Sequence, residues 1–367
     1  MSDRIALFMP SLAGGGAERV MVNLARGIVE RGFQVDMVVA QAEGPYVDEL
    51  PSQARIVDLA ARRVATSLFA LSRYLREVRP RSLLSAQTHA NIIALWARRV
   101  AGVDTRVVVS EHVNLGHSVK YSVRLSDRLM PYFVKKFYPW SDEVIAVSRG
   151  VADDLVDNLG VTADRIRVIY NPVVTPWLQA KTQERPDHAW LRDNQPPVVL
   201  GVGRLTEQKD FHTLIHAFAD VQRKKDARLI ILGEGEERPT LERLVTDLGL
   251  NDRVDMPGFV SNPFAYMAQS DVFALSSRWE GLATVIIEAM ACGTTVVSTD
   301  CPSGPTEILE NGKYGTLVPV GNAVALGQAI LAALDVPRDP AVLMQRANDF
   351  SIDRITDEYL QVLSVAS

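Results

Sequence analysis

The stretch Glu280-Gly281-Leu282-Ala283-Thr284-Val285-Ile286-Ile287-Glu288-Ala289-Met290-Ala291-Cys292-Gly293 predicts a tight turn that feeds a buried helix. From Leu282 to Cys292 the residues are apolar except at Thr284 and Glu288, and Gly293 supplies the left-handed position at which helices commonly end. Such a helix belongs in a core, where a carboxylate is costly unless a donor meets it. Glu288 therefore needs a polar partner, either an internal cation or a ligand.

The turn at Glu280 and Gly281 leaves the first N–H groups of this helix without partners inside it, and with the helix dipole they form a site for a phosphate group. Eight residues at about 1.5 Å each place the two glutamates up to roughly 12 Å apart. A nucleoside diphosphate sugar has this layout, with its hexose at Glu280, its diphosphate at the helix start and its ribose at Glu288. The simpler alternative is that Glu280 only complements the dipole while Glu288 pairs with an internal Lys or Arg.

Length and composition limit the classes of protein. With 367 residues, 47% of them hydrophobic, the chain is larger than one core usually supports, so two domains are expected. Cys292 and Cys301 lack the spacing of a zinc site or a disulfide framework, which fits a reducing cytoplasm. The N-terminus shows no cleavable signal, and no run of about 18 uncharged apolar residues predicts a membrane span.

Charge is distributed unevenly along the chain. Residues 1–172 hold 22 basic and 18 acidic residues, a net charge of +4, whereas residues 173–367 hold 17 and 26, a net charge of −9. This asymmetry argues against a nucleic-acid-binding protein and indicates an anionic partner for the first half alone.

Both halves alternate apolar runs with helical stretches, which predicts two doubly wound α/β domains with parallel sheets and a cleft between them. The expected strands cover residues 5–9, 34–40, 82–85, 106–110, 143–148, 166–172, 198–202, 228–232, 253–256, 272–275 and 295–298. Ligands then bind at the carboxyl ends of strands. Five prolines between Asn171 and Val198 indicate a linker, which is assigned to residues 173–197.

Glycines and cations occur where those strands end. The turn Gly14-Gly15-Gly16 follows the first strand, but a dinucleotide fingerprint would need glycine where Arg19 stands, which disfavours an NAD site. Arg204 and Lys209 lie in the first loop of the second domain, at the same sheet edge as Glu280. Two cations beside a helix start suit a diphosphate, although surface charge is the ordinary alternative.

The E-x7-E spacing of Glu280 and Glu288, together with the G-R-x5-K spacing of Gly203, Arg204 and Lys209, resembles the retaining, family 4 type glycosyltransferases with the GT-B fold. The resemblance covers nearly the whole chain. It implies an acceptor-side Rossmann-like domain at 1–172, a donor-binding Rossmann-like domain at 198–349 and a final helix within 350–367 that crosses back to the first domain. Ala283 departs from the Gly or Pro common at its position, which leaves donor preference open.

The resemblance also implies roles for single residues. It assigns catalysis to Glu280, His112, Arg204 and Lys209. Donor binding falls to Gly15, Gly16, Gly203, Arg204, Lys209, Gly235, Phe259, Val260, Glu280, Gly281, Leu282, Ala283, Thr284, Val285 and Glu288. Acceptor binding falls to Gly14, Arg19, Glu111, Asn114, Lys120, Arg124 and Arg128.

Lys120, Arg124 and Arg128 share one helical stripe. They form an ordinary solvated face, meet an anionic membrane, or grip the diphosphate of a lipid-linked acceptor. A second basic cluster lies at residues 73–81.

The resemblance implies a retaining transfer of a hexose or N-acetylhexosamine, with a UDP-linked donor favoured, to a hydroxyl of a saccharide or polyprenyl-diphosphate-linked acceptor in cell-surface glycan assembly. No D-x-D occurs in the chain, which disfavours a metal-clamped mechanism, and no cofactor is expected. A cytoplasmic enzyme, peripheral on the inner face of the membrane, is the expected setting. A nucleotide-sugar epimerase, an NAD-dependent dehydrogenase and a sugar-binding regulator are the competing readings.

Overall fold

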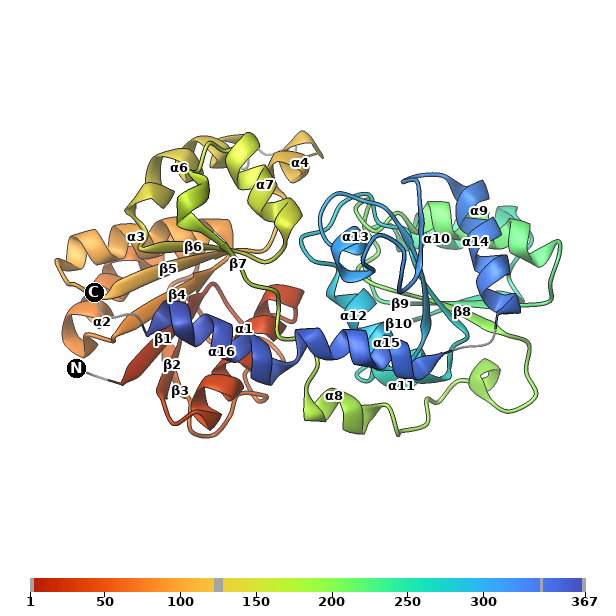
Figure 1. The fold of residues 1–367 in the computed structure, drawn as a ribbon, viewed down its shortest axis with the longest axis horizontal. Coiled ribbons are helices and arrows are strands. Elements are labelled where there is room, and N and C mark those ends of the chain that lie inside the picture. The colour runs from red at the N-terminus through yellow and green to blue at the C-terminus, as the bar shows by residue number, and fades with distance from the viewer. Residues whose placement is uncertain (1–2, 122–127, 337–338, 365–367) are drawn as a thin grey trace. The chain divides into compact units, whose positions relative to one another are not determined.

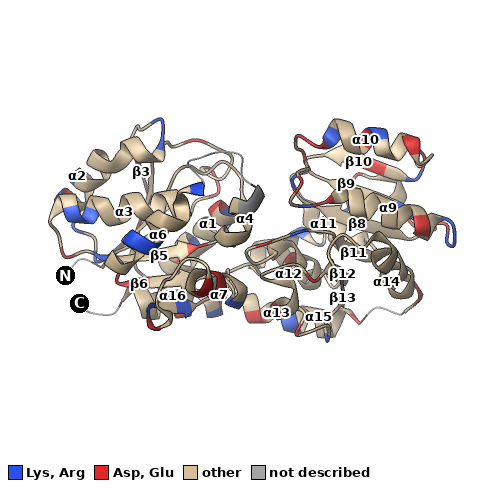
Figure 2. Ribbon diagram, turned by 90° about the horizontal axis from the view of Figure 1, so that it is seen from above, with Lys and Arg blue, Asp and Glu red and all other residues tan. Residues whose placement is uncertain are grey.

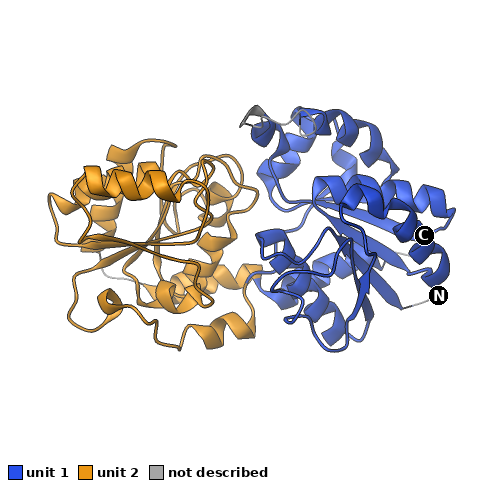
Figure 3. Ribbon diagram, turned by 180° about the vertical axis from the view of Figure 1, so that it is seen from behind, with its two compact units in different colours: residues 1–173, 351–367 blue, residues 174–350 orange. Residues whose placement is uncertain are grey.

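The computed structural model describes residues 3–121, 128–336 and 339–364. The chain divides into two compact units, which Figure 3 shows in different colours. Unit 1 contains residues 1–173 and 351–367, and unit 2 contains residues 174–350. Each unit has its own parallel sheet with helices on both of its faces (Figure 1).

Unit 1 is built on a seven-stranded sheet. Its order is β3 (Arg55–Asp58), β2 (Gln34–Val39), β1 (Arg4–Met9), β4 (Ser82–Ala86), β5 (Arg106–Glu111), β6 (Glu143–Ala146) and β7 (Ile166–Val168). The central strands are buried on both faces, as continuous apolar runs predict. The helices are α1 (Gly16–Glu30), α2 (Leu68–Val78), α3 (Thr88–Ala101), α4 (Leu115–Tyr121), α6 (Met130–Phe137), α7 (Arg149–Asp157) and α16 (Ile352–Leu363).

Unit 2 is built on a six-stranded sheet. Its order is β10 (Val254–Gly258), β9 (Arg228–Leu232), β8 (Val198–Val202), β11 (Val272–Leu275), β12 (Thr295–Thr299) and β13 (Thr316–Val318). The helices are α8 (Pro176–Lys181), α9 (Phe211–Gln222), α10 (Arg238–Asp247), α11 (Pro263–Gln269), α12 (Thr284–Ala291), α13 (Pro305–Ile308), α14 (Ala323–Asp335) and α15 (Pro340–Ala347).

Strand order reverses once in each sheet. In unit 1, β1 lies between β2 and β4, and in unit 2, β8 lies between β9 and β11. Loops at the carboxyl ends of such neighbouring strands leave in opposite directions and open a crevice, so ligands of doubly wound sheets bind there. The switch points therefore direct attention to the loops after β1 and β4 and to those after β8 and β11.

The last helix, α16, completes the core of unit 1. Ile355, Tyr359 and Val362 are buried in the same cluster as the apolar residues of α1 and β1. Arg31 pairs with Asp357, and Arg106 Nε donates to the carbonyl of Val362 at 2.8 Å. Residues from the two ends of the chain therefore share one hydrophobic core.

The proline-rich segment 173–197 is largely folded onto unit 2. Pro176 occupies the first turn of α8, where its missing N–H has no helical partner to lose, so it starts a helix instead of breaking one. Trp177 packs edge-on against Phe264, with ring centroids 5.6 Å apart, and His188 Nε2 lies 2.9 Å from Asp255 Oδ2. The segment assigned as a linker therefore contains a short helix.

Two strands were absent from the predicted set. The strand β3 is mostly exposed at the edge of its sheet, and β13 has three residues, so neither produces a continuous buried run. Among the residues that the structure describes, no helix combines the length and apolar character needed to cross a bilayer.

Candidate functional site

The loops that follow β8 and β11, the two strands at the switch point of unit 2, are joined by hydrogen bonds. The Arg278 N–H donates to the Gln208 carbonyl at 2.8 Å, and Ser276 Oγ donates to the Lys209 carbonyl at 2.8 Å. Gln208 Nε2 donates to the Trp279 carbonyl at 2.9 Å. Residues 208–209 are therefore fixed against residues 276–279, and this places the two predicted motifs beside one another.

Lys209 and Glu280 meet directly. Lys209 Nζ lies 2.6 Å from Glu280 Oε1, and the Ser277 hydroxyl donates to the same oxygen at 2.6 Å. Only 14% of the Lys209 side chain and 8% of the Glu280 side chain are exposed. A buried pair of this kind is neutral as a whole but holds an ammonium at the switch point. The sequence predicted both residues for the site but not their contact.

Arg204 is the exposed cation of this edge. Its loop is held from below by the turn after β9: Leu205 N donates to the Glu234 carbonyl at 2.9 Å, and Glu237 N donates to the Leu205 carbonyl at 3.0 Å. A Cβ on Gly235 would lie 2.2 Å from the Leu205 carbonyl oxygen, so only glycine permits this approach. Gly235 thus supports the loop that carries Arg204.

The helix α12 begins directly after this site. Ile286, Ile287, Ala289 and Met290 are buried, as predicted for a core helix. Thr284, Val285 and Glu288 are only partly buried and lie on one helical face. The expectation that Glu288 sits wholly in the core is therefore wrong, because its face of the helix is partly open to solvent. Gly293 adopts φ of 74°, the predicted left-handed end of the helix.

Ala283 caps α12 in a left-handed conformation, with φ of 46° and ψ of 53°. Its carbonyl accepts the Ile286 N–H at 2.9 Å, while the first N–H groups of the helix have no partner within it. These N–H groups and the helix dipole lie four residues after Glu280, where the sequence predicts an anion site. Unit 2 holds five further residues predicted to bind the sugar donor. Gly203, Gly281 and Leu282 lie in the same loops, and Phe259 and Val260 follow β10, where Phe259 is 78% exposed.

The two cysteines, Cys292 at the C-terminal end of α12 and Cys301 after β12, are poor nucleophiles. Burial raises the pKa of both the Cys292 and the Cys301 thiols, and the nearby carboxylates of Glu288 and Glu280 raise them further. Both thiols therefore stay protonated at neutral pH.

The glycine turn of unit 1 lies at the carboxyl end of β1. Gly14 has a φ of 101°, and Gly15 and Gly16 begin α1. Arg19 pairs with Glu49 and stacks on Tyr46, with its guanidinium carbon 3.9 Å from the ring centroid. Arg19 is thus held beside the turn by contacts within unit 1.

Glu111 lies inside unit 1 at the end of β5. Its carboxylate accepts Tyr138 Oη–H at 2.7 Å, Thr88 Oγ1–H at 3.0 Å and the His112 N–H at 3.2 Å, and none of its surface is exposed. Burial raises the pKa of Glu111 to about 7. In this position the side chain has no surface to offer an acceptor, so the predicted acceptor contact of Glu111 does not fit, and its hydrogen bonds instead hold Thr88 and the backbone of His112.

His112 and Asn114 follow β5 at the same sheet edge. Burial lowers the pKa of His112 to about 4, so its imidazole is neutral at pH 7, and its Nε2 lies 3.0 Å from Ser110 Oγ. Asn114 Oδ1 accepts the His117 N–H at 3.0 Å, which starts α4. Both predicted residues therefore stand at the carboxyl edge of the sheet, His112 as a neutral hydrogen-bonding group.

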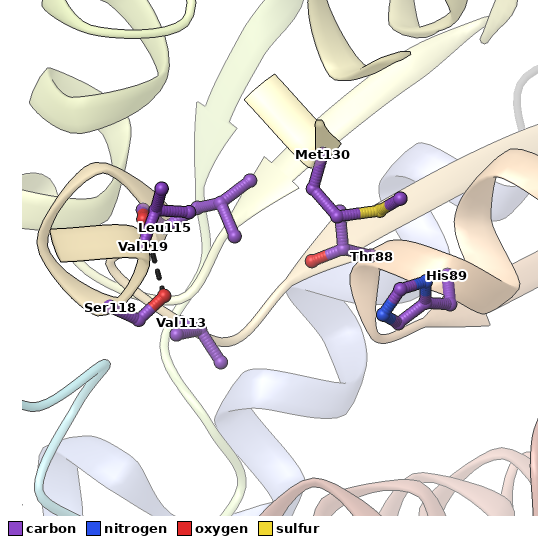
Figure 4. Close-up of a pocket in the computed structure, with 7 residues that line it drawn as sticks. All are labelled: Thr88, His89, Val113, Leu115, Ser118, Val119 and Met130. Atoms are coloured by element: carbon purple, nitrogen blue, oxygen red, sulfur yellow. Dashed lines mark hydrogen bonds between the residues drawn. The ribbon is translucent and has the colours of Figure 1, made fainter. Parts of the chain in front are cut away.

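A hollow of about 220 Å³ opens beside these residues (Figure 4). Its walls come from the start of α3, the loop after β5, α4 and the start of α6, and the lining residues are Thr88, His89, Val113, Leu115, Ser118, Val119 and Met130. None of them is Lys, Arg, Asp or Glu. The hollow suits an uncharged group with both apolar and hydrogen-bonding surface.

The predicted basic stripe is only partly described. Arg124 lies outside the described residues, Lys120 is described in its backbone alone, and Arg128 is exposed. The neighbouring helix α6 carries further basic residues (Figure 2), among them Lys136, whose Nζ lies 5.7 Å from the centroid of the Tyr132 ring.

Sequence comparisons place these features in a family. The model of the glycosyl transferases group 1 matches residues 182–350, and that of the glycosyltransferase family 4 matches residues 14–176. The chain is also 32% identical, over 91% of its length and 90% of the relative's, to a Campylobacter jejuni enzyme named N-acetylgalactosamine-N,N'-diacetylbacillosaminyl-diphospho-undecaprenol 4-alpha-N-acetylgalactosaminyltransferase. The chain belongs to the group 1 glycosyltransferases.

Other relatives agree with this assignment. The glycosyltransferase is 31% identical to LpsE of Rhizobium meliloti, a lipopolysaccharide core biosynthesis glycosyltransferase, over 95% of this chain and 96% of that one. Its fold matches that of the lipopolysaccharide outer core galactosyltransferase WaaB, with a TM-score of 0.74, 21% identity and coverage of 98% and 99% of the two chains. The Anabaena protein HepE in complex with UDP-glucose matches with a TM-score of 0.78, 23% identity and coverage of 98% and 99%. The predicted GT-B fold is confirmed.

Four residues of these sites were missed. Ser277, Asp210 and Arg278 flank the Lys209–Glu280 pair, and Gln87, at φ of 77°, donates to Glu18 Oε1 at 3.0 Å beside the glycine turn of the glycosyltransferase. Asp210, Ser277 and Arg278 stand one to three residues from a predicted site residue. That proximity was the available signal.

Proposed function

We propose that the protein is a retaining glycosyltransferase that moves a hexose or N-acetylhexosamine from a UDP-sugar to a hydroxyl group of a saccharide or polyprenyl-diphosphate-linked acceptor. One observation carries the proposal: Lys209 and Glu280 meet at the switch point of unit 2, one turn from the start of α12. An ammonium, a set of helix N–H groups and a carboxylate suit a diphosphate joined to a polyhydroxylated ring.

In the proposed reaction, the acceptor oxygen forms a bond to the anomeric carbon while the bond from that carbon to the donor diphosphate breaks. The acceptor's proton passes to the departing diphosphate on the same face of the sugar. Arg204, Lys209 and the first N–H groups of α12 stabilise the negative charge that develops on the diphosphate. No covalent enzyme nucleophile is invoked.

Carboxylates and the neutral imidazole orient the donor. Glu280 accepts hydrogen bonds from the hexose hydroxyls, and Glu288, on the partly open face of α12, accepts them from the ribose. His112 contacts the hexose as a neutral group, because its lowered pKa of about 4 keeps it uncharged at pH 7.

The transfer is proposed to need no metal. Arg204 and Lys209 with the helix start supply the positive charge that a bound cation supplies in other enzymes. Within residues 3–121, 128–336 and 339–364, no group of three or more His, Cys, Asp and Glu side chains forms a metal-binding cluster. Activity in excess chelator tests this part directly.

The proposed acceptor takes support from the relatives' names. The C. jejuni relative is named for transfer to a diphospho-undecaprenol-linked saccharide, and the R. meliloti relative for lipopolysaccharide core biosynthesis. We assign the uncharged saccharide end of such an acceptor to the surroundings of His112 and Asn114 in unit 1, within cell-surface glycan assembly.

A lipid-linked acceptor favours an enzyme that works at the inner face of the cytoplasmic membrane. On α6, exposed Tyr132 lies beside Lys136, and Lys135 adds a second charge. Each cation near anionic lipid contributes about 1 kcal/mol, so the contact is peripheral and reversible by salt. Sedimentation with anionic vesicles at low and high salt tests it, with Lys135→Gln/Lys136→Gln as the weakened variant.

One experiment tests the function. The protein is incubated with UDP-, GDP- and ADP-linked hexoses and N-acetylhexosamines together with polyprenyl-diphosphate saccharides, and the products are read by mass. Transfer from a UDP-sugar with the anomeric configuration kept, seen by NMR, is expected. Absence of transfer from every donor, or inversion of the anomeric centre, contradicts the proposal.

A further inference from the structure

Asp210, next to Lys209 in sequence, makes more contacts than a helix cap requires. Its side chain is 2% exposed, and its oxygens accept the Thr213 N–H at 3.3 Å and the Thr213 hydroxyl at 2.9 Å, which caps α9. The same carboxylate accepts Arg278 Nε–H at 3.1 Å. The backbone at Asp210 is left-handed, with φ of 46°.

The negative charge of Asp210 is not explained by the cap or by the turn. Asparagine caps helices about as well as aspartate and adopts the left-handed region as readily. The group in contact that needs a charge is the guanidinium of Arg278, which also reaches Glu207 at 3.4 Å. The ion pair between Asp210 and Arg278 therefore needs an explanation besides helix capping.

The position of the Asp210–Arg278 pair indicates its role. Asp210 is one residue from Lys209, and Arg278 is two residues from Glu280, so the ion pair crosses between the two loops directly beside the Lys209–Glu280 contact. Misplacement of a catalytic group by about 1 Å can cost on the order of 100-fold in rate.

We propose that Asp210 and Arg278 are positioning residues that fix Lys209 and Glu280 against the diphosphate and the hexose. The inference rests on the proposed function, because it concerns the same donor site. Neither residue touches the reacting atoms in this proposal. Both act through the backbone of the loops that carry Lys209 and Glu280.

The test uses three variants of the full chain: Asp210→Asn, Arg278→Gln and the two combined. Asp210→Asn keeps the helix cap and the left-handed turn and removes only the charge. A matched control is the exposed pair of Asp226 and Arg253, 2.7 Å apart and away from the site, in the variants Asp226→Asn and Arg253→Gln. For each protein, kcat per folded molecule, donor KM, the Kd of UDP and the melting temperature are measured.

We expect kcat to fall about 10- to 100-fold in each single variant, with the UDP Kd within about threefold of wild type. Because both changes break one pair, the double variant should lose no more than the worse single variant. The control variants should keep wild-type kcat.

A kcat within twofold of wild type in both single variants overturns the proposal, as do losses that multiply in the double variant. A melting temperature that falls while kcat per folded molecule is unchanged assigns the pair to stability alone and also overturns it. These outcomes require a wild-type enzyme that transfers sugar. A wild-type enzyme that transfers none rejects the proposed function first, and this inference with it.

Discussion

The carboxyl edges of the two sheets share a topology, but the residues that follow β5 in unit 1 differ in charge from those that follow β8 and β11 in unit 2. In unit 2, the switch point holds the ion pair of Lys209 and Glu280 and the exposed Arg204. In unit 1, the loop after β5 holds a neutral His112, a buried Glu111 whose pKa is raised to about 7, and a hollow whose described lining residues include no Lys, Arg, Asp or Glu.

Under the proposed function, the contrast assigns two kinds of ligand to the groups at the strand ends of one fold. Fixed charge suits the part of a substrate that leaves as an anion, and neutral hydrogen-bonding groups suit a saccharide. The contrast also predicts different responses. Loss of a charge in unit 2 should change stability and turnover, and a change of pH should change the stability of unit 1.

The largest expected effect is on the stability of unit 2. Lys209→Met leaves Glu280 buried at 8% exposure without its cation, which should lower the free energy of unfolding by about 3–5 kcal/mol. Lys209→Met/Glu280→Gln removes both charges and should recover most of that loss. Denaturant unfolding measures both. A single variant within 1 kcal/mol of wild type would show that Ser277 alone satisfies Glu280.

In the same variants, turnover should stay low even where stability recovers. Lys209→Met should lower kcat on the order of 100- to 1,000-fold, as expected for a lost transition-state donor, and the stable double variant should remain equally inactive. Arg204→Ala should also lower kcat more than donor affinity. Steady-state kinetics decide this, and kcat within threefold of wild type for both Lys209→Met and Arg204→Ala contradicts the proposed role of charge in unit 2.

A smaller effect concerns the pH dependence of unit 1. The raised pKa of Glu111, from 4.5 to about 7, gives stability that is full below pH 4.5 and lost as the pH rises to 7, by about 3 kcal/mol. The lowered pKa of His112, from 6.5 to about 4, gives stability that is full above pH 6.5 and lost as the pH falls to 4. The two slopes oppose each other between pH 4.5 and 6.5.

Replacing one of these two residues should therefore reveal the pH dependence of stability that the other one causes. Glu111→Gln should leave a protein whose stability rises with pH between 4 and 6.5, and His112→Asn one whose stability falls between pH 4.5 and 7. Unfolding curves measured at several pH values test this, and parallel pH profiles for Glu111→Gln and wild type would rule out the buried carboxylate as their source.

The smallest expected effect is at the start of α12. Ala283 adopts φ of 46°, which costs a residue with a Cβ about 1 kcal/mol or more and costs glycine little. Ala283→Gly should raise the free energy of unfolding by about 0.5–1 kcal/mol. Ala289→Gly, in the buried interior of the same helix, should instead lower it by at least that amount. Equal effects of the two changes would argue against strain at Ala283.

The sequence predicted what depends on local pattern. Residues close together in the sequence determine β8, β11 and the helix that begins at Thr284. Their predicted positions therefore agree with the structure within a few residues. The prediction failed where structure depends on distant partners. Lys209 and Glu280 stand 71 residues apart, and no local pattern shows that they form an ion pair.

The burial of Glu111 and Glu288 was mispredicted for the same reason. The apolar helix indicated a buried Glu288, yet its face is partly open. The family resemblance assigned Glu111 to acceptor binding, yet this side chain is fully buried. Whether a carboxylate faces ligand or core depends on what packs over it, here Tyr138 and Thr88 for Glu111. That information lies in tertiary structure.

The helix α16 has a consequence for how the chain is made. Unit 1 takes part of its core from residues 351–367, so a ribosome must produce all of residues 174–350 before unit 1 can be completed. At about 5–20 residues per second this takes roughly 10–35 s. Until then, the apolar surface that receives Ile355 and Tyr359 remains uncovered. A separately synthesised peptide of residues 350–367 should bind to a chain that ends before α16.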